Sequence, residues 1–346
     1  MKKYLILIII VIATSLSAQN LRFNSDFLLE TKYNSNILNL SQNDLDRFDS
    51  GNEPNKFSLK TSDDLIISAK VGLSLKHRLF AGHTQINRIA VKYNKYLKNS
   101  FEDNYYLELS LKQFLSKKLN FGIYYYYYPK IYVNRYDSVL DPVNIFRDFT
   151  YSKNNYIGKV YYKLNSKFQF NYKFGFSQLF YNEYFTEYDA NNIENKIGIR
   201  ITPSGWISIN SNYTYKISNA KAGDIFSDSQ QVTIIKDPSY KADLFDLSIN
   251  FPRILSLFSN PVNLGLSVKY EHFYFQSKNE LNEYHYGRED KILTFNSNTK
   301  YKVSENVSLK YFYKYKVRNT NSPYTIVEVD KEYNTFETGL LITLSL

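Results

Sequence analysis

Alternation of apolar and polar residues with a period of two runs through most of the chain. Between Asp64 and Lys76, apolar residues occupy every odd position, and most even positions are polar or small. The same pattern recurs in segments 107–112, 168–177, 262–271 and 307–316. Successive side chains of a strand point to opposite faces, so each segment has one apolar and one polar face. No comparable helical pattern is seen, and the sequence therefore predicts an all-β protein.

About fourteen such strands are predicted, most of them at least about nine residues long, which lets a tilted strand cross the hydrocarbon layer of a membrane. They are expected to start near Leu21, Asp64, Ile86, Asn104, Leu119, Tyr151, Phe168, Asn191, Trp206, Lys241, Val262, Lys291, Val307 and Lys331. A soluble β-sandwich is the alternative, but its strands are seldom this long.

The connections between the strands are of two kinds that alternate along the chain. The short ones are 116–118, 165–167, 203–205 and 304–306, with two somewhat longer at 78–85 and 252–261. The long ones are 36–63, 98–103, 131–150, 183–190, 218–240, 277–290 and 318–330. Short periplasmic turns and long extracellular loops are typical of an outer-membrane barrel. Because an open sheet edge would leave backbone groups unpaired in lipid, we predict a single closed antiparallel transmembrane β-barrel.

The first residues of the chain indicate export. Lys2 and Lys3 precede an apolar run, 5–12, that is too short to span a bilayer and is followed by small and polar residues. This is the pattern of a secretory signal peptide, and an uncleaved membrane anchor is the alternative. We expect residues 1–18 to be removed after Ala18 and residues 19–346 to form the barrel. The chain has no cysteine, so disulfides do not stabilise it.

Tyrosine is abundant, and five tyrosines follow one another in the segment 122–130, GIYYYYYPK. On a barrel strand, Tyr124, Tyr126 and Tyr128 are expected to face the lumen, and Pro129 to end the pairing. The opposite parity and the position near strand ends predict an outer aromatic girdle at the level of the lipid headgroups. Its expected members are Tyr125, Tyr127, Tyr213, Tyr215, Tyr313 and Tyr315.

Basic residues outnumber acidic ones at positions of lumen parity, and the formal net charge of the whole chain is +10. The candidate selectivity residues are Lys300, Lys302, Lys310, Lys314, Lys316, Lys112, Arg88 and Lys92. The first five lie on two neighbouring predicted strands and are expected close together on one wall. Basic walls in a pore favour anions, whereas a mixed-charge lumen without selectivity is the alternative. Nucleic-acid binding is not expected of an exported protein.

Catalytic and metal-binding chemistry is sparse in this sequence. The only histidines are His77, His83, His272 and His285, and there is no cysteine, so we expect no transition-metal site and no cofactor. Ser267 or Ser277 could be paired with His272 as in outer-membrane lipases, but spacing alone is no evidence, and we do not expect an enzyme. The acidic segment 41–49 lacks a calcium-loop signature and is interpreted as a solvated loop.

The last strand, from Phe336 to Leu346, resembles the C-terminal signal of bacterial outer-membrane β-barrels of the porin-like kind, although such signals usually end on Phe. Segment 31–37, TKYNSNI, is similar to the Tyr-Asp-Ser-Asn opening of some porin families of unknown substrate, with Asn34 in place of the Asp. The resemblance covers the whole mature chain. It implies the outer membrane of a Gram-negative bacterium as location, and the barrel-assembly machinery, lipid and lipopolysaccharide as partners.

The expected function is passive diffusion of small polar or anionic solutes through a basic lumen. A barrel of this size is wide enough for a lumen that one inward-folded loop narrows, with 36–63 and 218–240 as candidates. Two alternatives stay open: an export, assembly or surface-binding barrel that acts through its external loops, and a transporter of hydrophobic substrates with an apolar pocket and a lateral gap in the wall.

Overall fold

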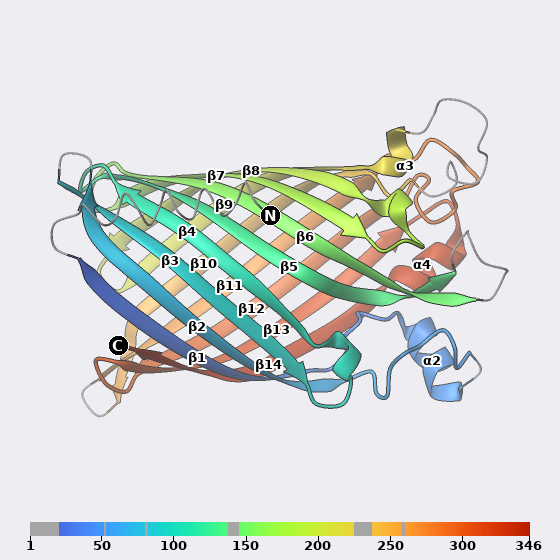
Figure 1. Cartoon of the computed structure of the whole chain (residues 1–346), viewed down its shortest axis with the longest axis horizontal. Helices are drawn as coiled ribbons and strands as arrows, with labels where there is room; N and C mark the ends of the chain where they lie inside the picture. The colour runs from blue at the N-terminus through green and yellow to red at the C-terminus, as the bar shows by residue number, and fades with distance from the viewer. Residues whose placement is uncertain (1–20, 52, 80–81, 138–144, 225–236, 258–259) are drawn as a thin grey trace.

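The computed structural model describes residues 21–51, 53–79, 82–137, 145–224, 237–257 and 260–346, and the predicted signal peptide lies outside them. Fourteen antiparallel strands form one closed barrel (Figure 1), which confirms the predicted fold class. The strands are β1 (Arg22–Asn34), β2 (Asp64–Leu79), β3 (His83–Tyr96), β4 (Asn104–Phe114), β5 (Leu119–Asp137), β6 (Phe146–Lys163), β7 (Phe168–Tyr181), β8 (Ala190–Ser204), β9 (Ile207–Ala220), β10 (Tyr240–Leu257), β11 (Asn260–Phe275), β12 (Glu289–Lys302), β13 (Val307–Asn321) and β14 (Tyr333–Ser345).

The first and last strands close the ring. β1 pairs with β14 from Asp26 opposite Ser345 to Asn34 opposite Glu337. Next to the first of these pairs, Leu346 and Ser25 exchange backbone hydrogen bonds of 2.8 and 3.0 Å. This pairing satisfies the backbone groups that would otherwise lie at two free sheet edges.

The outer wall of the barrel is apolar. Phe23, Val71, Ile123, Ile197 and Leu340 each expose more than half of their surface, and each lies at an outward position of its strand. A continuous exposed apolar surface of this kind is that of a protein embedded in lipid. Separately, no helix within the described residues is long and apolar enough to span a membrane.

The connections form a short-turn end, after the even-numbered strands, and a loop end, after the odd-numbered strands (Figure 1). The loops at the loop end contain α2 (Gln42–Ser50), α3 (Lys221–Asp224), α4 (Thr325–Lys331) and the short 3-10 helices η1 (Ser100–Glu102) and η2 (Thr186–Tyr188). The sequence showed no helical periodicity for them because each is only a few residues long. In α2, Ser41 caps the N-terminus and Gly51, at φ 67°, ends the helix.

Two predicted connections are wrong because strands extend into them. Segment 131–150 was expected to be a loop, yet β5 continues to Asp137 and β6 begins at Phe146. Pro129 does not end the pairing of β5 with β6. Bulges between Tyr128 and Ile131 and between Tyr132 and Asn134 leave a few residues of β5 unpaired, and the pairing continues beyond them. Likewise, the predicted turn 252–261 is mostly strand, since a bulge between Pro252 and Leu255 lets β10 continue to Leu257.

Candidate functional site

The lumen is the candidate site, and all eight predicted selectivity residues lie at its inward-facing positions. Strand parity shows this directly. On β13 the outward Leu309, Tyr311 and Tyr313 are exposed, and Lys310 and Lys314 occupy the alternate, inward positions. The eight residues nevertheless differ in their contacts, because some pair with carboxylates and others do not.

One part of the lumen wall, on β1 to β4, is a network of ion pairs. Arg88 on β3 pairs through both terminal nitrogens with Asp26 on β1, one contact being 2.8 Å. Its Nε lies 3.7 Å from Glu108 on β4, which also accepts a 2.7 Å hydrogen bond from Lys70 on β2. The pairs Arg88–Asp26 and Lys70–Glu108 join strands that are not adjacent, so these side chains lie across the strand between them.

Two further predicted selectivity residues are also neutralised by carboxylates. Lys92 donates a 3.0 Å hydrogen bond to Glu30, again from β3 to β1. Lys314 and Lys32 both pair with Glu337 on β14, at 3.0 and 3.1 Å. Arg88, Lys92 and Lys314 therefore contribute less positive potential than their sequence parity predicts.

By contrast, Lys300, Lys302 and Lys310 form no ion pair within the described residues. Lys300 and Lys310 are direct cross-strand partners at the short-turn end of β12 and β13. The structure thus brings these three lysines together as predicted. Lys316 lies farther toward the loop end, where its Nζ is 5.0 Å from the ring of Tyr333, so the five lysines do not form one cluster.

A second basic feature was not predicted, and we call it the lysine row: Lys112, Lys159, Lys173 and Lys196. In the strand register, Gly122 is the partner of both Lys112 and Lys159. Lys159 is in turn the partner of Lys173, and Lys173 that of Lys196. The row therefore crosses β4 to β8 along the hydrogen-bonding direction, perpendicular to the strands. Lys173 pairs with Glu194 at 2.6 Å, whereas the other three form no ion pair in the described part of the chain. Parity in the sequence marks each residue as inward, but only the register aligns them.

Tyrosines cover the wall next to the lysine row. As predicted, Tyr124, Tyr126 and Tyr128 have lumen parity, and Tyr106 on β4 contacts two of them, with ring centroids 6.1 Å from Tyr126 and 5.1 Å from Tyr128. Lys159 lies over the ring of Tyr124 at 4.5 Å.

The six predicted girdle tyrosines lie at outward positions, and some contact outward rings on neighbouring strands. Tyr125 lies 5.1 Å from Tyr156 and Tyr213 lies 5.1 Å from Phe245. Their contact with lipid headgroups stays a prediction.

Contacts between loops cover the loop end. Phe149 on β6 packs against Phe185 and Tyr188 of the η2 loop, with centroids 4.8 and 4.9 Å apart. Tyr188 in turn lies 6.4 Å from His285 in the loop between β11 and β12. From the other side, Lys331 of α4 lies over the ring of Tyr136 on β5 at 5.6 Å. These contacts join loops that start from distant strands of the barrel.

The predicted inward-folded loop takes a different position. Segment 36–63 builds a small core of Leu40, Phe57 and Leu59, against which Phe48 of α2 and Phe101 pack. Figure 1 shows α2 at the loop end, beyond the ends of β1 and β2, the strands that this loop connects, so α2 does not fold into the barrel. The other candidate, 218–240, falls partly outside the described residues.

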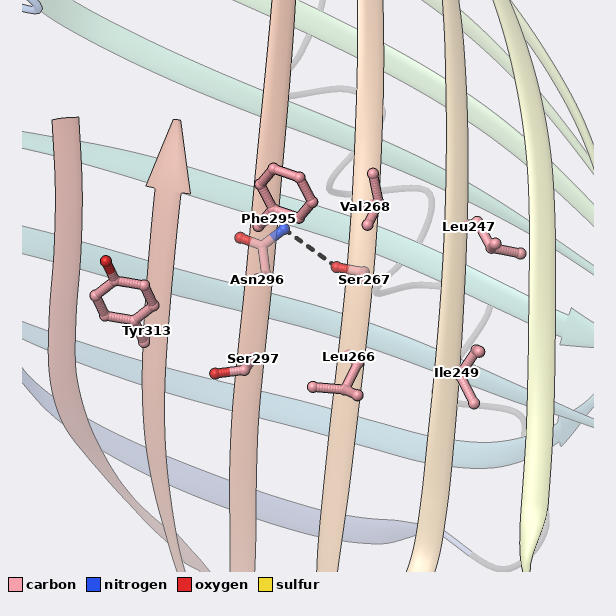
Figure 2. A pocket seen from close by; sticks show the side chains of 9 residues that line it. All are labelled: Leu247, Ile249, Leu266, Ser267, Val268, Phe295, Asn296, Ser297 and Tyr313. Atoms are coloured by element: carbon pink, nitrogen blue, oxygen red, sulfur yellow. Dashed lines mark hydrogen bonds between the residues drawn. The ribbon is translucent and has the colours of Figure 1, made fainter. Parts of the chain in front are cut away.

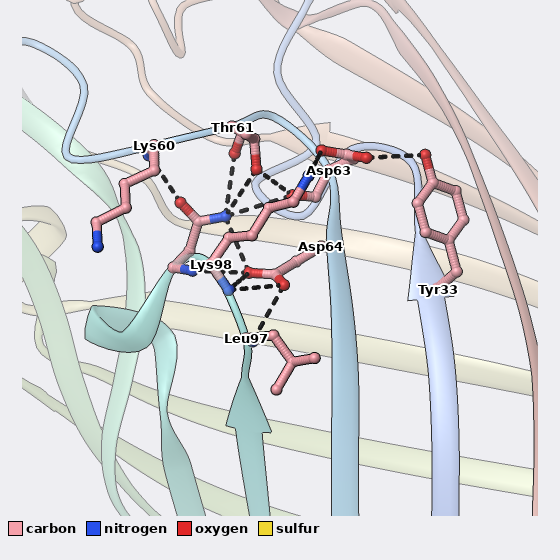
Figure 3. A network of polar contacts seen from close by, with 8 residues as sticks. Tyr33, Lys60, Thr61, Asp63, Asp64, Leu97 and Lys98 are labelled. Carbon is pink, nitrogen blue, oxygen red and sulfur yellow. Dashed lines mark hydrogen bonds and ion pairs between the residues drawn. The ribbon is translucent and has the colours of Figure 1, made fainter.

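A buried carboxylate fixes the loop between β3 and β4 (Figure 3). Asp64 is 1% exposed and accepts hydrogen bonds from the backbone N–H groups of Leu97, Lys98 and Asn99, the shortest being 2.8 Å. Asn99, which is fully buried, also donates its side-chain amide to Asp64 at 3.0 Å. Asp64 thereby ties the first residues of this loop to the start of β2.

Two titratable groups of the loops are held away from their ordinary ionisation. Burial raises the pKa of Glu102 in η1 to about 8, an effect that Lys130 opposes only in part, and its Oε1 has no hydrogen-bond partner among the described residues. Burial, together with the charges of Arg288 and Arg318, lowers the pKa of Lys331 to about 8. Both shifts favour the uncharged side chain within the packed loops.

The outer wall carries a hollow of about 340 Å³ over β10 to β13 (Figure 2). Its outward lining is Leu247, Ile249, Leu266, Val268, Phe295, Ser297 and Tyr313. Between these rows, Asn296 donates a 3.1 Å hydrogen bond to Ser267. The hollow is apolar and faces lipid, so it does not provide a lumen pocket for a hydrophobic substrate.

The contacts of His272 do not include either of the serines considered for a catalytic pair. His272 lies at an outward position, where its ring nitrogens contact Glu289 at 2.9 Å and Tyr274 at 2.8 Å. Neither serine considered for a catalytic pair is its partner: Ser267 has inward parity, and Ser277 accepts a hydrogen bond from Asn282. No group of three or more His, Cys, Asp or Glu side chains with metal-binding geometry occurs among the described residues.

No protein-family model matches the chain, and no curated protein matches it. Among solved structures it is similar to OmpT, an outer-membrane protein of Vibrio cholerae, with 8% identity, a TM-score of 0.48, and 94% of this chain and 97% of that chain covered. It is also similar to an anion-selective porin from Comamonas acidovorans, with 8% identity, a TM-score of 0.46 and coverages of 94% and 99%. A bacterial polysaccharide outer membrane secretin has 9% identity, a TM-score of 0.47 and coverages of 93% and 98%. At these low scores, the strand pairing itself remains the evidence for the fold.

Proposed function

We propose that the protein is an outer-membrane channel through which small anionic solutes diffuse. The observation that carries the proposal is the excess of lysines in the lumen without carboxylate partners. Lys112, Lys159 and Lys196 in the lysine row and Lys300 and Lys310 at the short-turn end hold this charge on inward positions. Uncompensated cations on a pore wall raise the local concentration of anions.

The exterior of the barrel supports the location. Its exposed apolar side chains need lipid, and a closed ladder is the one strand arrangement that a bilayer tolerates. A Gram-negative outer membrane with its lipopolysaccharide is the setting we propose. Assembly through the C-terminal strand, Phe336 to Leu346, is part of the same proposal, since β14 must find β1 to complete the ring.

Reversal potentials in planar bilayers under a potassium chloride gradient test the proposal. Two double variants, Lys159→Glu with Lys196→Glu and Lys300→Glu with Lys310→Glu, should each shift the preference from chloride toward potassium. Lys291→Glu is the matched control, because Lys291 lies on β12 at an outward, exposed position. Unchanged reversal potentials in both double variants, or a wild-type preference for potassium, would remove anion selectivity from the account.

A surface-binding or assembly barrel is the second candidate, and the interlocked loops favour it. Rings from the loop-end parts of β5 and β6 and from the loops after β7 and β11 pack together, which gives a partner an ordered surface. Wild-type protein that inserts into bilayers without conducting would support this candidate. A transporter with a lateral gap is disfavoured, because every neighbouring pair of the fourteen strands is hydrogen-bonded.

A further inference from the structure

The consecutive tyrosines on β5 contribute to a wall of the lumen with an unusual composition. On β4, β5 and β6 the inward positions include five phenol rings, those of Tyr106, Tyr124, Tyr126, Tyr128 and Tyr161. All five side chains are half-buried, and none of their hydroxyls forms a hydrogen bond within the described protein or is a buried atom. The wall therefore presents both ring surface and hydroxyls to the lumen.

Cationic groups lie at one end of this tyrosine wall. Gly122 is the cross-strand partner of Lys112 on one side and of Lys159 on the other. Because Gly122 has no side chain, the ring of Tyr124 folds over it: a Cβ built at Gly122 would lie 2.7 Å from Cε2 of that ring. Lys159 is 4.5 Å from the centroid of the same ring. The ring of Tyr124 thus covers Gly122, between Lys112 on one side and Lys159 on the other.

The charge of this site is not cancelled locally. Glu108 is the acidic residue with lumen parity on β4 to β6, and Lys70 binds it at 2.7 Å while Arg88 lies 3.7 Å away. Lys112 and Lys159 form no ion pair among the described residues. The ammonium group of Lys112 lies 4.8 Å from the ring of Phe114, and that of Lys159 lies over Tyr124. A negatively charged group that enters the lumen can therefore approach either ammonium group without displacing a carboxylate.

We infer that this wall is a binding site for acidic sugars, the carboxylate lying at Lys112 and Lys159 and the sugar ring along Tyr124, Tyr126 and Tyr128. The inference rests on the proposed anion channel and names its substrate class. A sugar has an apolar face for the rings and hydroxyls that can pair with the phenols. A plain aromatic carboxylate would take water from those hydroxyls without replacing the hydrogen bonds, which costs affinity.

Single-channel recording with D-glucuronate as the probe tests the inference. D-Glucuronate should interrupt the chloride current at concentrations about tenfold lower than D-glucose or acetate, since each of these lacks one of the two recognised features. Equal block by acetate would reduce the site to plain anion attraction and overturn the sugar assignment. Stronger block by benzoate than by D-glucuronate would overturn it in favour of aromatic carboxylates.

Variants test whether the D-glucuronate block depends on the tyrosine wall. Tyr124→Leu with Tyr126→Leu should weaken the D-glucuronate block about tenfold by removing two ring contacts. The matched control is Tyr125→Leu with Tyr127→Leu, the same substitutions at outward positions of the same strand, which should leave the block unchanged. Should the inward leucine pair fail to fold, Tyr124→Phe with Tyr126→Phe keeps the rings, and loss of the hydroxyls should still weaken the block severalfold.

The outcomes separate this inference from the function on which it rests. Chloride preference with no specific D-glucuronate block leaves the anion channel intact and overturns only the acidic-sugar site. A wild-type channel without chloride preference contradicts the proposed function itself. An inward and an outward variant pair that weaken the block equally would show that the tyrosine wall is not the site.

Discussion

The guanidinium of Arg88 on β3 crosses β2 above Gly72 to pair with the carboxylate of Asp26 on β1. A Cβ built at Gly72 would lie 2.1 Å from Nη2 of Arg88, so any larger residue at position 72 occupies the path of the arginine. Gly122 has the same relation to the ring of Tyr124. Gly72 and Gly122 are thus inward positions over which a long side chain of the same or another strand lies.

The first prediction concerns Gly72→Ala. The new methyl group should displace Arg88 from Asp26 and lower the free energy of unfolding by about 1.5–3 kcal/mol, the range for hydrogen bonds to charged groups. Urea unfolding in detergent, followed by tryptophan fluorescence, measures it. Gly158→Ala is the control, because a Cβ at Gly158 meets nothing within 4 Å. Equal stability of both variants would contradict a structural role for the crossing pair.

Removal of a carboxylate from the lumen should increase anion preference. Glu337 binds both Lys32 and Lys314, so Glu337→Gln leaves two lysines without their partner. The reversal potential under a potassium chloride gradient should move further toward that of chloride. Glu305→Gln, in the exposed turn after β12, makes the same change outside the barrel wall and should have a smaller effect. A shift toward potassium in Glu337→Gln would contradict the electrostatic account.

Asp64 should determine the order of the loop that follows β3. Asp64→Ala removes the acceptor of the backbone N–H groups of Lys98 and Asn99, at a cost of at least about 2 kcal/mol, whereas the N–H of Leu97 keeps its second acceptor, the carbonyl of Leu65. Hydrogen exchange should then accelerate in residues 97–103, while the strands of the barrel stay protected. Asp63→Ala is the neighbouring control, since its contacts to Tyr33 and Lys98 are partly exposed and contribute little. Unchanged exchange in Asp64→Ala would be evidence against this anchor.

The η1 loop should loosen as the pH rises through about 8. Glu102 has a pKa of about 8 in the folded loop and an ordinary value of 4.5, so between these values the folded loop retains a proton that the unfolded loop releases. Its stabilising effect is complete below 4.5 and is lost as the pH rises through the folded pKa. Exchange rates in 97–103 of the wild type, divided by those of Glu102→Gln at the same pH, should increase severalfold from about pH 6 to about pH 9. A ratio independent of pH would mean that Glu102 does not titrate in this range.

Strand parity made most of the barrel predictable from the sequence. Period-two segments such as 64–76 identify the strands, because lipid outside and water inside impose opposite demands on alternate side chains. The limits lie where the pairing departs from regularity. Nothing in the residues around Pro129 shows that bulges let β5 continue past it, since the compensating shift lies in its pairing with β6.

The lumen was less predictable because its chemistry depends on register and on pairs across strands. Lys300 and Lys310 were expected to lie together, and they are direct partners. The neutralisation of Lys314 by Glu337 was not predicted, although both residues have lumen parity, because the stagger of β13 on β14 decides it. The lysine row was missed for the same reason. The register of five strands must be known before its members can be placed side by side.

The most direct test of the wet, basic lumen is the reactivity of single cysteines introduced along β5. Because the chain has no cysteine of its own, only the introduced thiol can react. Cysteines placed at positions 124, 125, 126, 127 and 128 would be exposed, in lipid vesicles, to an anionic and a cationic methanethiosulfonate. The account predicts that Tyr124→Cys, Tyr126→Cys and Tyr128→Cys react, faster with the anionic reagent, and that Tyr125→Cys and Tyr127→Cys are protected by lipid. Equal reactivity at neighbouring positions would contradict a wet lumen, and faster reaction with the cation would contradict its basic character.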